Sequence, residues 1–272
     1  MTGRVPRDPA TAEALARLYD LDVAEDPGDL DLYLALAART GGPILELAVG
    51  SGRLAVPLAA AGWDVTGVDI DSAMLARART AAAAARSAGG RPASEVGTRL
   101  HLVEADLVDL RLESAGTFRL AFIALNSLLV LGTRAAQRAA VGTLAAHLAP
   151  GGIAAIDIWQ PDAEDLARFD GRLVLEYPRT EPETGRIVTK ISSATHDAAT
   201  QRVELISIYE EALQGQPAVR WVRQDTLRLV SADELVGYAE DAGLEIEQLA
   251  GGYDLDPIAP ASDRAILVAV RR

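Results

Sequence analysis

The chain has 272 residues, a formal net charge of −13 and no cysteine. The acid excess argues against nucleic acid as a partner, because phosphate contacts need a basic face, and the lack of cysteine excludes disulfides and thiolate metal sites. No apolar run approaches the ~18 residues of a membrane span, and no signal-peptide core lies near the start. We therefore expect a soluble, cytoplasmic protein whose negative field favours a neutral or cationic small partner.

Two helices are predicted ahead of the first strand. Leucines and alanines at helical spacing indicate helices over residues 8–19 and 29–39. Asp29 is expected to cap the second helix, and Gly41-Gly42 to end it. Residues 1–42 are thus expected to form an N-terminal helical cap.

Residues 43–71 predict a strand, a glycine turn, a helix and a second strand. The turn Gly50-Ser51-Gly52 follows an apolar run, and its glycines allow a tight turn and a close approach to a ligand. The second strand ends at Asp69, 17 residues past the last glycine of the turn. This spacing suits an acid that binds a ribose. The G-x-G-x-x-A pattern alone is equally compatible with NAD binding.

Two further features favour a different cofactor. Glu46 lies inside the first strand, where an NAD fingerprint normally has an apolar residue. The order E-x-x-x-G-x-G, strand-end acid, then Ser72 and Met74-Leu75 opening the next helix resembles the class I S-adenosylmethionine (SAM) methyltransferases. NAD-dependent reduction stays open as the alternative.

The ends of the next two strands carry further motifs of this family. A strand over residues 98–104 precedes Ala105-Asp106-Leu107, which the resemblance assigns to adenine binding. A strand over residues 117–125 precedes Asn126, where the family's fourth motif lies beside the methyl group. No Pro-Pro follows Asn126, which argues against a nucleobase substrate. No carboxylate cluster lies there either, so we predict no metal.

An antiparallel sheet is predicted between the fifth strand and the last helix. Four runs of strand formers separated by turns span residues 173–179, 187–197, 202–212 and 219–230. An insertion at this point is expected to rise from the edge of the parallel sheet where ligands bind. We expect it to form a substrate wall with Tyr209, Trp221 and Arg223. The alternative is that these side chains only hold the small sheet together.

The predicted fold class is α/β: a Rossmann-like, seven-stranded, doubly wound sheet with an N-terminal helical cover and an inserted antiparallel sheet. The last helix begins at a capping box from Ser231, and the closing strand pair is expected to end antiparallel to the others. The predicted domains are the cap (1–42), the SAM-binding core (43–170), the inserted sheet (171–230) and the closing helix and strands (231–272).

The whole chain resembles bacterial natural-product tailoring N-methyltransferases, in particular amino-sugar N,N-dimethyltransferases, with peptide-amine methyltransferases as a related group. The resemblance implies in-line transfer of one or two methyl groups from SAM to a small-molecule or peptide amine, leaving S-adenosylhomocysteine. It also implies a monomer or homodimer. No convincing general base is seen, which favours an amine over an alcohol. Two alternatives stay open: O- or C-methylation of a small metabolite, and a SAM-binding relative that transfers no methyl.

The resemblance also implies roles for individual residues. Tyr19 and Tyr33 are expected to cover SAM, because aromatic faces and tyrosine oxygens suit a cation, and with Asn126 they form the expected reaction centre. His147 is expected to be structural, and Asp157 to be a satisfied core acid. The expected cofactor contacts are Tyr33, Glu46, Ala48, Gly50, Gly52, Asp69, Ile70, Met74, Ala105, Asp106, Leu107 and Asn126.

Overall fold

The computed structural model describes residues 8–25, 27–85, 93–213 and 215–272. They form two compact units, each of which is described by itself. The first unit comprises the described part of Met1–Pro27 with Val130–Gly132 and Pro161–Leu229. The second comprises Gly28–Leu129, Thr133–Gln160 and Val230–Arg272. Within the described ranges, no helix is long and apolar enough to span a membrane.

The second unit is built on a seven-stranded sheet in the order β10-β11-β5-β4-β1-β2-β3. Its parallel centre is β1, which pairs with β2 on one side and with β4 on the other. The last strand, β11, is antiparallel to both β5 and β10, which confirms the predicted doubly wound fold and its closing pair. The strands are β1 (Ile44–Leu47), β2 (Val65–Asp69), β3 (Leu100–Glu104), β4 (Phe118–Ile123), β5 (Leu148–Trp159), β10 (Leu244–Ala250) and β11 (Arg264–Arg271).

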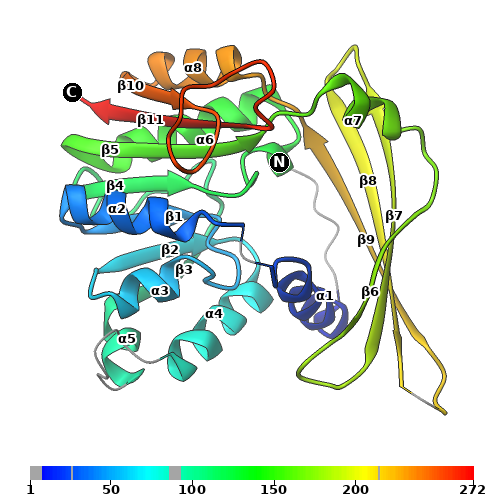
Figure 1. The fold of residues 1–272 in the computed structure, drawn as a ribbon. Coiled ribbons are helices and arrows are strands. Elements are labelled where there is room, and N and C mark those ends of the chain that lie inside the picture. The colour runs from blue at the N-terminus through cyan, green and yellow to red at the C-terminus, as the bar shows by residue number, and fades with distance from the viewer. Residues whose placement is uncertain (1–7, 26, 86–92, 214) are drawn as a thin grey trace. The chain divides into compact units, whose positions relative to one another are not determined.

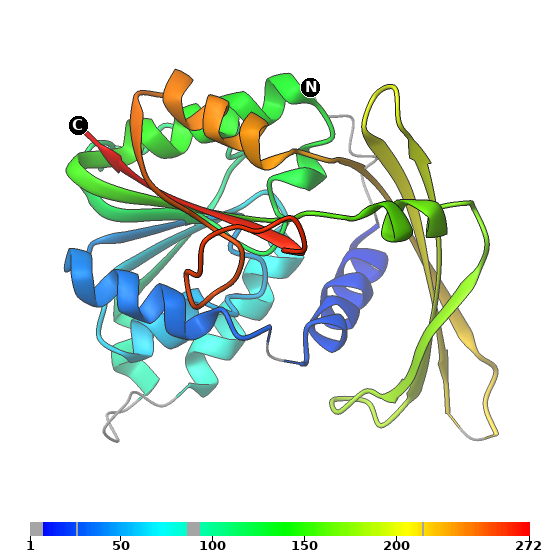
Figure 2. The ribbon, with the colours of Figure 1, turned by 45° about the horizontal axis from the view of Figure 1, so that its top comes forward.

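Helices cover both faces of this sheet (Figures 1 and 2). Helices α2 (Leu30–Thr40) and α3 (Ala55–Ala60) lie on one face, and α6 (Arg134–His147) and α8 (Ala232–Asp241) lie on the other. Helix α4 (Ser72–Ala84) follows β2, and Gly41 ends α2 in the left-handed conformation, as predicted.

Two local features of the second unit differ from the prediction. The short helix α5 (Ala93–Arg99) was not predicted, since its few residues show no clear apolar period. Strand β5 begins at Leu148, directly after α6, so Pro150 and both following glycines lie inside the strand rather than in a loop. The pairing of β5 with β4 shifts register there, which accommodates the break.

The first unit is an antiparallel sheet in the order β6-β7-β8-β9 with α1 (Pro9–Asp22) against one face. Apolar side chains of α1, among them Leu18, pack on Val188 and Tyr209. The predicted strands are confirmed to within two residues at each end: β6 (Val174–Thr180), β7 (Ile187–Asp197), β8 (Arg202–Ala212) and β9 (Val219–Arg228). On the opposite face, one apolar row crosses all four strands through Leu175, Ile191, Ile208 and Val222.

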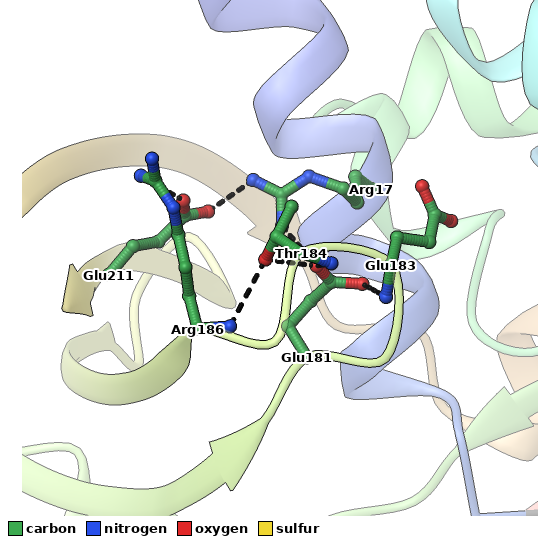
Figure 3. A network of polar contacts seen from close by, with 6 residues as sticks. All are labelled: Arg17, Glu181, Glu183, Thr184, Arg186 and Glu211. Carbon is green, nitrogen blue, oxygen red and sulfur yellow. Dashed lines mark hydrogen bonds and ion pairs between the residues drawn. The ribbon is translucent and has the colours of Figure 1, made fainter. Parts of the chain in front are cut away.

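A network of charged side chains fastens α1 to this sheet (Figure 3). Arg17 of α1 forms ion pairs with Glu181, at 3.0 Å, and with Glu211. Both glutamates are buried. Glu181 also accepts a 2.6 Å hydrogen bond from the Thr184 hydroxyl, and Arg186 lies 3.4 Å from Glu211. Arg17 is therefore shared by two buried carboxylates, each of which keeps a second partner.

We expect Arg17→Leu to lower the free energy of unfolding by about 1.5–3 kcal/mol, the contribution of a hydrogen bond to a charged group. Urea denaturation followed by tryptophan fluorescence measures the loss. The matched control is Arg168→Leu, which breaks an exposed pair with Glu164 and should cost under about 1 kcal/mol. Equal losses in the two variants would contradict this interpretation of the network.

Candidate functional site

The loop after β1 has the backbone conformation that a close ligand approach needs. Ala48, Gly50 and Gly52 all have positive φ, at 61°, 56° and 85°. A Cβ on Gly52 would lie 2.9 Å from Val56 Cγ2 and 3.2 Å from Ala78 Cβ, so this position tolerates only glycine. The loop therefore lies tightly against α3 and α4 at the carboxyl edge of the sheet.

Asp69 joins this loop to the end of β2. One of its carboxylate oxygens accepts a 2.9 Å hydrogen bond from the Gly50 N–H, and the other accepts a 2.8 Å bond from the Asp71 N–H. A carboxylate can accept about four hydrogen bonds, so these two bonds are compatible with further donors such as ribose hydroxyls. The next side chain, Ile70, is 49% exposed and offers an apolar surface beside the acid.

The end of β3 lies next to the end of β2. The Ala105 N–H donates a 3.0 Å hydrogen bond to the Asp69 carbonyl, and Asp106 accepts from the Val108 N–H at 2.9 Å. Leu107 is buried beside them. The structure thus brings together the glycine loop, the strand-end acid and the predicted adenine contacts along one edge.

A buried ion pair that the sequence analysis missed lies beside the loop. The two Nη atoms of Arg53 are each 2.6 Å from one carboxylate oxygen of Asp29, whose side chain is 0% exposed. The prediction that the Asp29 side chain caps α2 was wrong, because that carboxylate faces Arg53 and makes no capping bond. The pair ties the loop to the start of α2.

Glu46 and Tyr33 each have a buried oxygen without a hydrogen-bond partner in the described chain. Burial raises the pKa of the Glu46 carboxyl well above its usual range, against the opposing charge of Arg53. Burial and nearby carboxylates also raise the pKa of Tyr33 well above its usual range. An unpaired buried polar group costs about 1–3 kcal/mol, so an ammonium group or a water in this place would relieve the cost.

The ring of Tyr33 belongs to the core. Tyr33 is fully buried, and its ring centroid lies 4.3 Å from that of Phe122 in β4. The ring that the sequence analysis expects to cover SAM thus packs in the core, and the Tyr33 hydroxyl is buried with it.

The turn after β4 places Asn126 at the same edge of the sheet. Asn126 has a φ of 66°, and its side-chain oxygen accepts a 2.6 Å hydrogen bond from the Trp159 N–H. Its amide NH₂ is not used in that bond. Met74, on the first turn of α4 after the strand-end acid, is partly buried.

The remaining predicted residues lie in the first unit. Tyr209 is 2% exposed and donates a 2.6 Å hydrogen bond to Asp22 of α1, which favours packing over substrate contact. Trp221 is the register partner of Tyr209 and packs on the same cluster. Arg223 pairs with Asp225 of the same strand. Tyr19 lies on α1 and is partly buried.

His147 has the structural place that the sequence predicts. The ring is buried, with Nδ1 2.7 Å from the Thr143 carbonyl oxygen and Nε2 accepting from the Leu112 N–H at 3.3 Å. These partners put the proton on Nδ1. The imidazole therefore connects α6 to the chain before β4 and is not available as a base.

Comparison with known proteins shows similarity to methyltransferases. Residues 44–152 match the family model described as a methyltransferase domain, and no curated protein matches in sequence. The methyltransferase CcbJ from Streptomyces caelestis superposes with a TM-score of 0.73 at 23% identity, covering 92% of this chain and 98% of that one. A SAM-dependent methyltransferase from Clostridium acetobutylicum superposes with a TM-score of 0.74 at 17% sequence identity, covering 95% of this chain and 98% of that one. The sugar N-methyltransferase KedS8 from a Streptoalloteichus species superposes with a TM-score of 0.67 at 24% sequence identity, covering 93% of this chain and 92% of that one.

The fold of the chain is that of these methyltransferases, and residues 44–152 carry the matched methyltransferase domain. One similar structure is complexed with S-adenosylhomocysteine, and another holds bound SAM. The site fits this cofactor, since it combines a strand-end acid, a glycine loop and unpaired buried oxygens.

Proposed function

We propose that the protein transfers one or two methyl groups to an amine of a small molecule or peptide in natural-product biosynthesis. The observation that carries this proposal is the state of three titratable groups of the second unit: Asp157, Tyr253 and Tyr33. Asp157 is paired with Arg264. Burial raises the pKa of both Tyr253 and Tyr33. None of these groups is suited to take a proton from an alcohol, whereas a neutral amine attacks without a base.

The names of similar structures support an amine as acceptor. KedS8 is named a sugar N-methyltransferase, and CalS10 from Micromonospora echinaspora an amino pentose methyltransferase. MtfA is named a glycopeptide N-methyltransferase. Each of these chains is below 25% identical to this one, so the names describe those proteins and only motivate the proposal here.

We assign the cofactor contacts as follows. Asp69 accepts from the ribose hydroxyls, and Glu46 accepts from the ammonium group of the methionine part. Bound SAM supplies a methyl group already activated by the sulfonium. The protein then has to orient the amine and exclude water, and such positioning can contribute ~7–11 kcal/mol. The adenine contacts are Ile70, Met74, Ala105, Asp106 and Leu107; Ala48, Gly50 and Gly52 form the loop around the methionine end.

We place the reaction centre at Asn126 and the Tyr33 hydroxyl. Within the first unit, Tyr19, Trp221 and Arg223 stay candidates for contact with a substrate. Tyr209 is the weakest of the sequence-predicted substrate contacts, because its hydroxyl is already bonded to Asp22.

Mass spectrometry of the purified protein with SAM and a panel of acceptors tests the proposal. The panel contains amino sugars, amino acids and peptides with free amines, each paired with the corresponding hydroxyl compound as a control. The expected result is an amine product heavier by one or two methylene units, formed together with S-adenosylhomocysteine. Methylation of the hydroxyl compounds alone would replace the proposal by O-methylation. Bound SAM with no product from either series would favour a relative that transfers no methyl.

A further inference from the structure

Two consecutive residues after β4 have a backbone conformation that side chains rarely adopt. Leu125 has a φ of 45° and Asn126 a φ of 66°, and neither is a glycine. Residues in this region persist only where the surrounding structure fixes them, and they gather at functional sites. Some group of the surrounding structure must therefore fix this turn.

Asp157 of the neighbouring strand β5 holds both residues. Its carboxylate Oδ2 accepts a 3.1 Å hydrogen bond from the Leu125 N–H. Its backbone carbonyl accepts a 3.1 Å hydrogen bond from the Asn126 N–H. Two residues further along β5, the Trp159 N–H donates to the Asn126 side chain. The turn is thus bonded to β5 at three points.

Asp157 is itself fixed by two side chains from the far end of the chain. Arg264 of β11 donates from Nε at 2.9 Å and from Nη2 at 2.6 Å to Oδ1 of Asp157. The Tyr253 hydroxyl donates at 3.0 Å to Oδ2, and the Arg264 guanidinium lies 5.0 Å from the centroid of the Tyr253 ring. The carboxylate is fully buried, and both of its oxygens are engaged.

Stability alone is a weak reason for this arrangement. A buried ion pair is often no more stabilising than well-packed apolar residues of similar volume, and the rest of β5 around Asp157 is apolar, with Ile156 and Ile158 on either side. What an apolar side chain could not do is accept a hydrogen bond from the Leu125 N–H. The geometry therefore points to a role in placing the turn.

We propose that Asp157 is a positioning residue for methyl transfer: it holds the Leu125–Asn126 turn so that the Asn126 amide faces the acceptor, and Arg264 and Tyr253 fix its carboxylate. The inference rests on the proposed function, because it needs an acceptor at the end of β4. Asp157 acts through Asn126 and makes no contact with the reacting atoms.

Two variants separate this role from a merely structural one. Asp157→Leu removes both carboxylate oxygens and should lower kcat by on the order of 10²-fold, the cost of a misplacement of about 1 Å, while the SAM dissociation constant changes by less than about threefold. The double variant Asp157→Asn with Arg264→Gln keeps an acceptor for the Leu125 N–H, since the new amide can donate to the glutamine oxygen. The double variant should keep kcat within about fivefold of the unsubstituted protein. It should therefore recover most of the activity that Asp157→Leu loses.

Hydrogen exchange gives a readout that needs neither cofactor nor acceptor. The amides of Leu125 and Asn126 should exchange at least about tenfold faster in Asp157→Leu than in the unsubstituted protein. The matched control is Thr143→Val, which removes a buried hydroxyl on α6 that donates to the Val108 carbonyl. It should change neither kcat nor exchange in the turn.

Two results would overturn the inference. The first is unchanged hydrogen exchange of the Leu125 and Asn126 amides in Asp157→Leu. The second is a double variant that binds SAM but is as inactive as Asp157→Leu. If Asp157→Leu does not fold, the double variant decides alone. Failure of the proposed function is recognised separately, because the unsubstituted protein would then methylate no amine. The exchange result would still show whether Asp157 holds the turn.

Discussion

Replacing Asp69 by alanine is expected to weaken SAM binding by roughly ten- to a hundredfold. A hydrogen bond to a charged group contributes about 1.5–3 kcal/mol, which corresponds to that range. The loss has two sources. The ribose hydroxyls lose their acceptor, and the Gly50 N–H loses the bond that fixes the glycine loop against β2.

Titration calorimetry with SAM measures this effect, and Asp71→Ala is its matched control. Asp71 lies two residues further on and caps α4 through a 3.0 Å bond from the Ala73 N–H. Its removal should cost about 1 kcal/mol of stability and leave SAM affinity nearly unchanged. Equal SAM affinity in Asp69→Ala and the unsubstituted protein would remove the ribose assignment.

Arg53→Leu is expected to lower the free energy of unfolding by about 3–5 kcal/mol, because removal of one partner leaves a buried charge uncompensated. The stranded group is the fully buried carboxylate of Asp29. Glu46 loses its neighbouring cation at the same time, and the glycine loop loses its tie to α2. SAM affinity should therefore fall together with stability.

Chemical denaturation of a series of variants tests the reason for this loss. The double variant Asp29→Leu with Arg53→Leu removes both charges and should recover most of the stability. Arg99→Leu breaks an exposed pair with Asp64 and should cost under about 1 kcal/mol. If the double variant is as unstable as Arg53→Leu alone, the loss comes from packing and not from the unpaired charge.

The structural features that the sequence predicts correctly are local in the chain. The loop Gly50–Gly52 and the end of β2 at Asp69 follow from turn chemistry and from the period of an apolar strand. The four strands of the inserted sheet also follow from alternation and turn residues. Their hydrogen-bonded register then decides which side chains share a face.

The parts that the sequence does not reveal depend on contacts between distant residues. Asp29 looks like a helix cap, and only the fold shows that Arg53, 24 positions later, takes its carboxylate. The bond between Asp157 and Arg264 spans 107 positions. Tyr209 is a large aromatic residue of the kind expected in a binding site. Its burial under α1 and its hydrogen bond to Asp22 favour a packing role instead.

The edge of the sheet formed by Asp69, the glycine loop and Asp106 is expected to bind SAM. Calorimetry of the unsubstituted protein with SAM, and separately with NADH under the same conditions, tests this most directly. We expect saturable binding of one SAM per chain and no heat from NADH beyond dilution. Binding of NADH, or the absence of SAM binding by the folded protein, would contradict it.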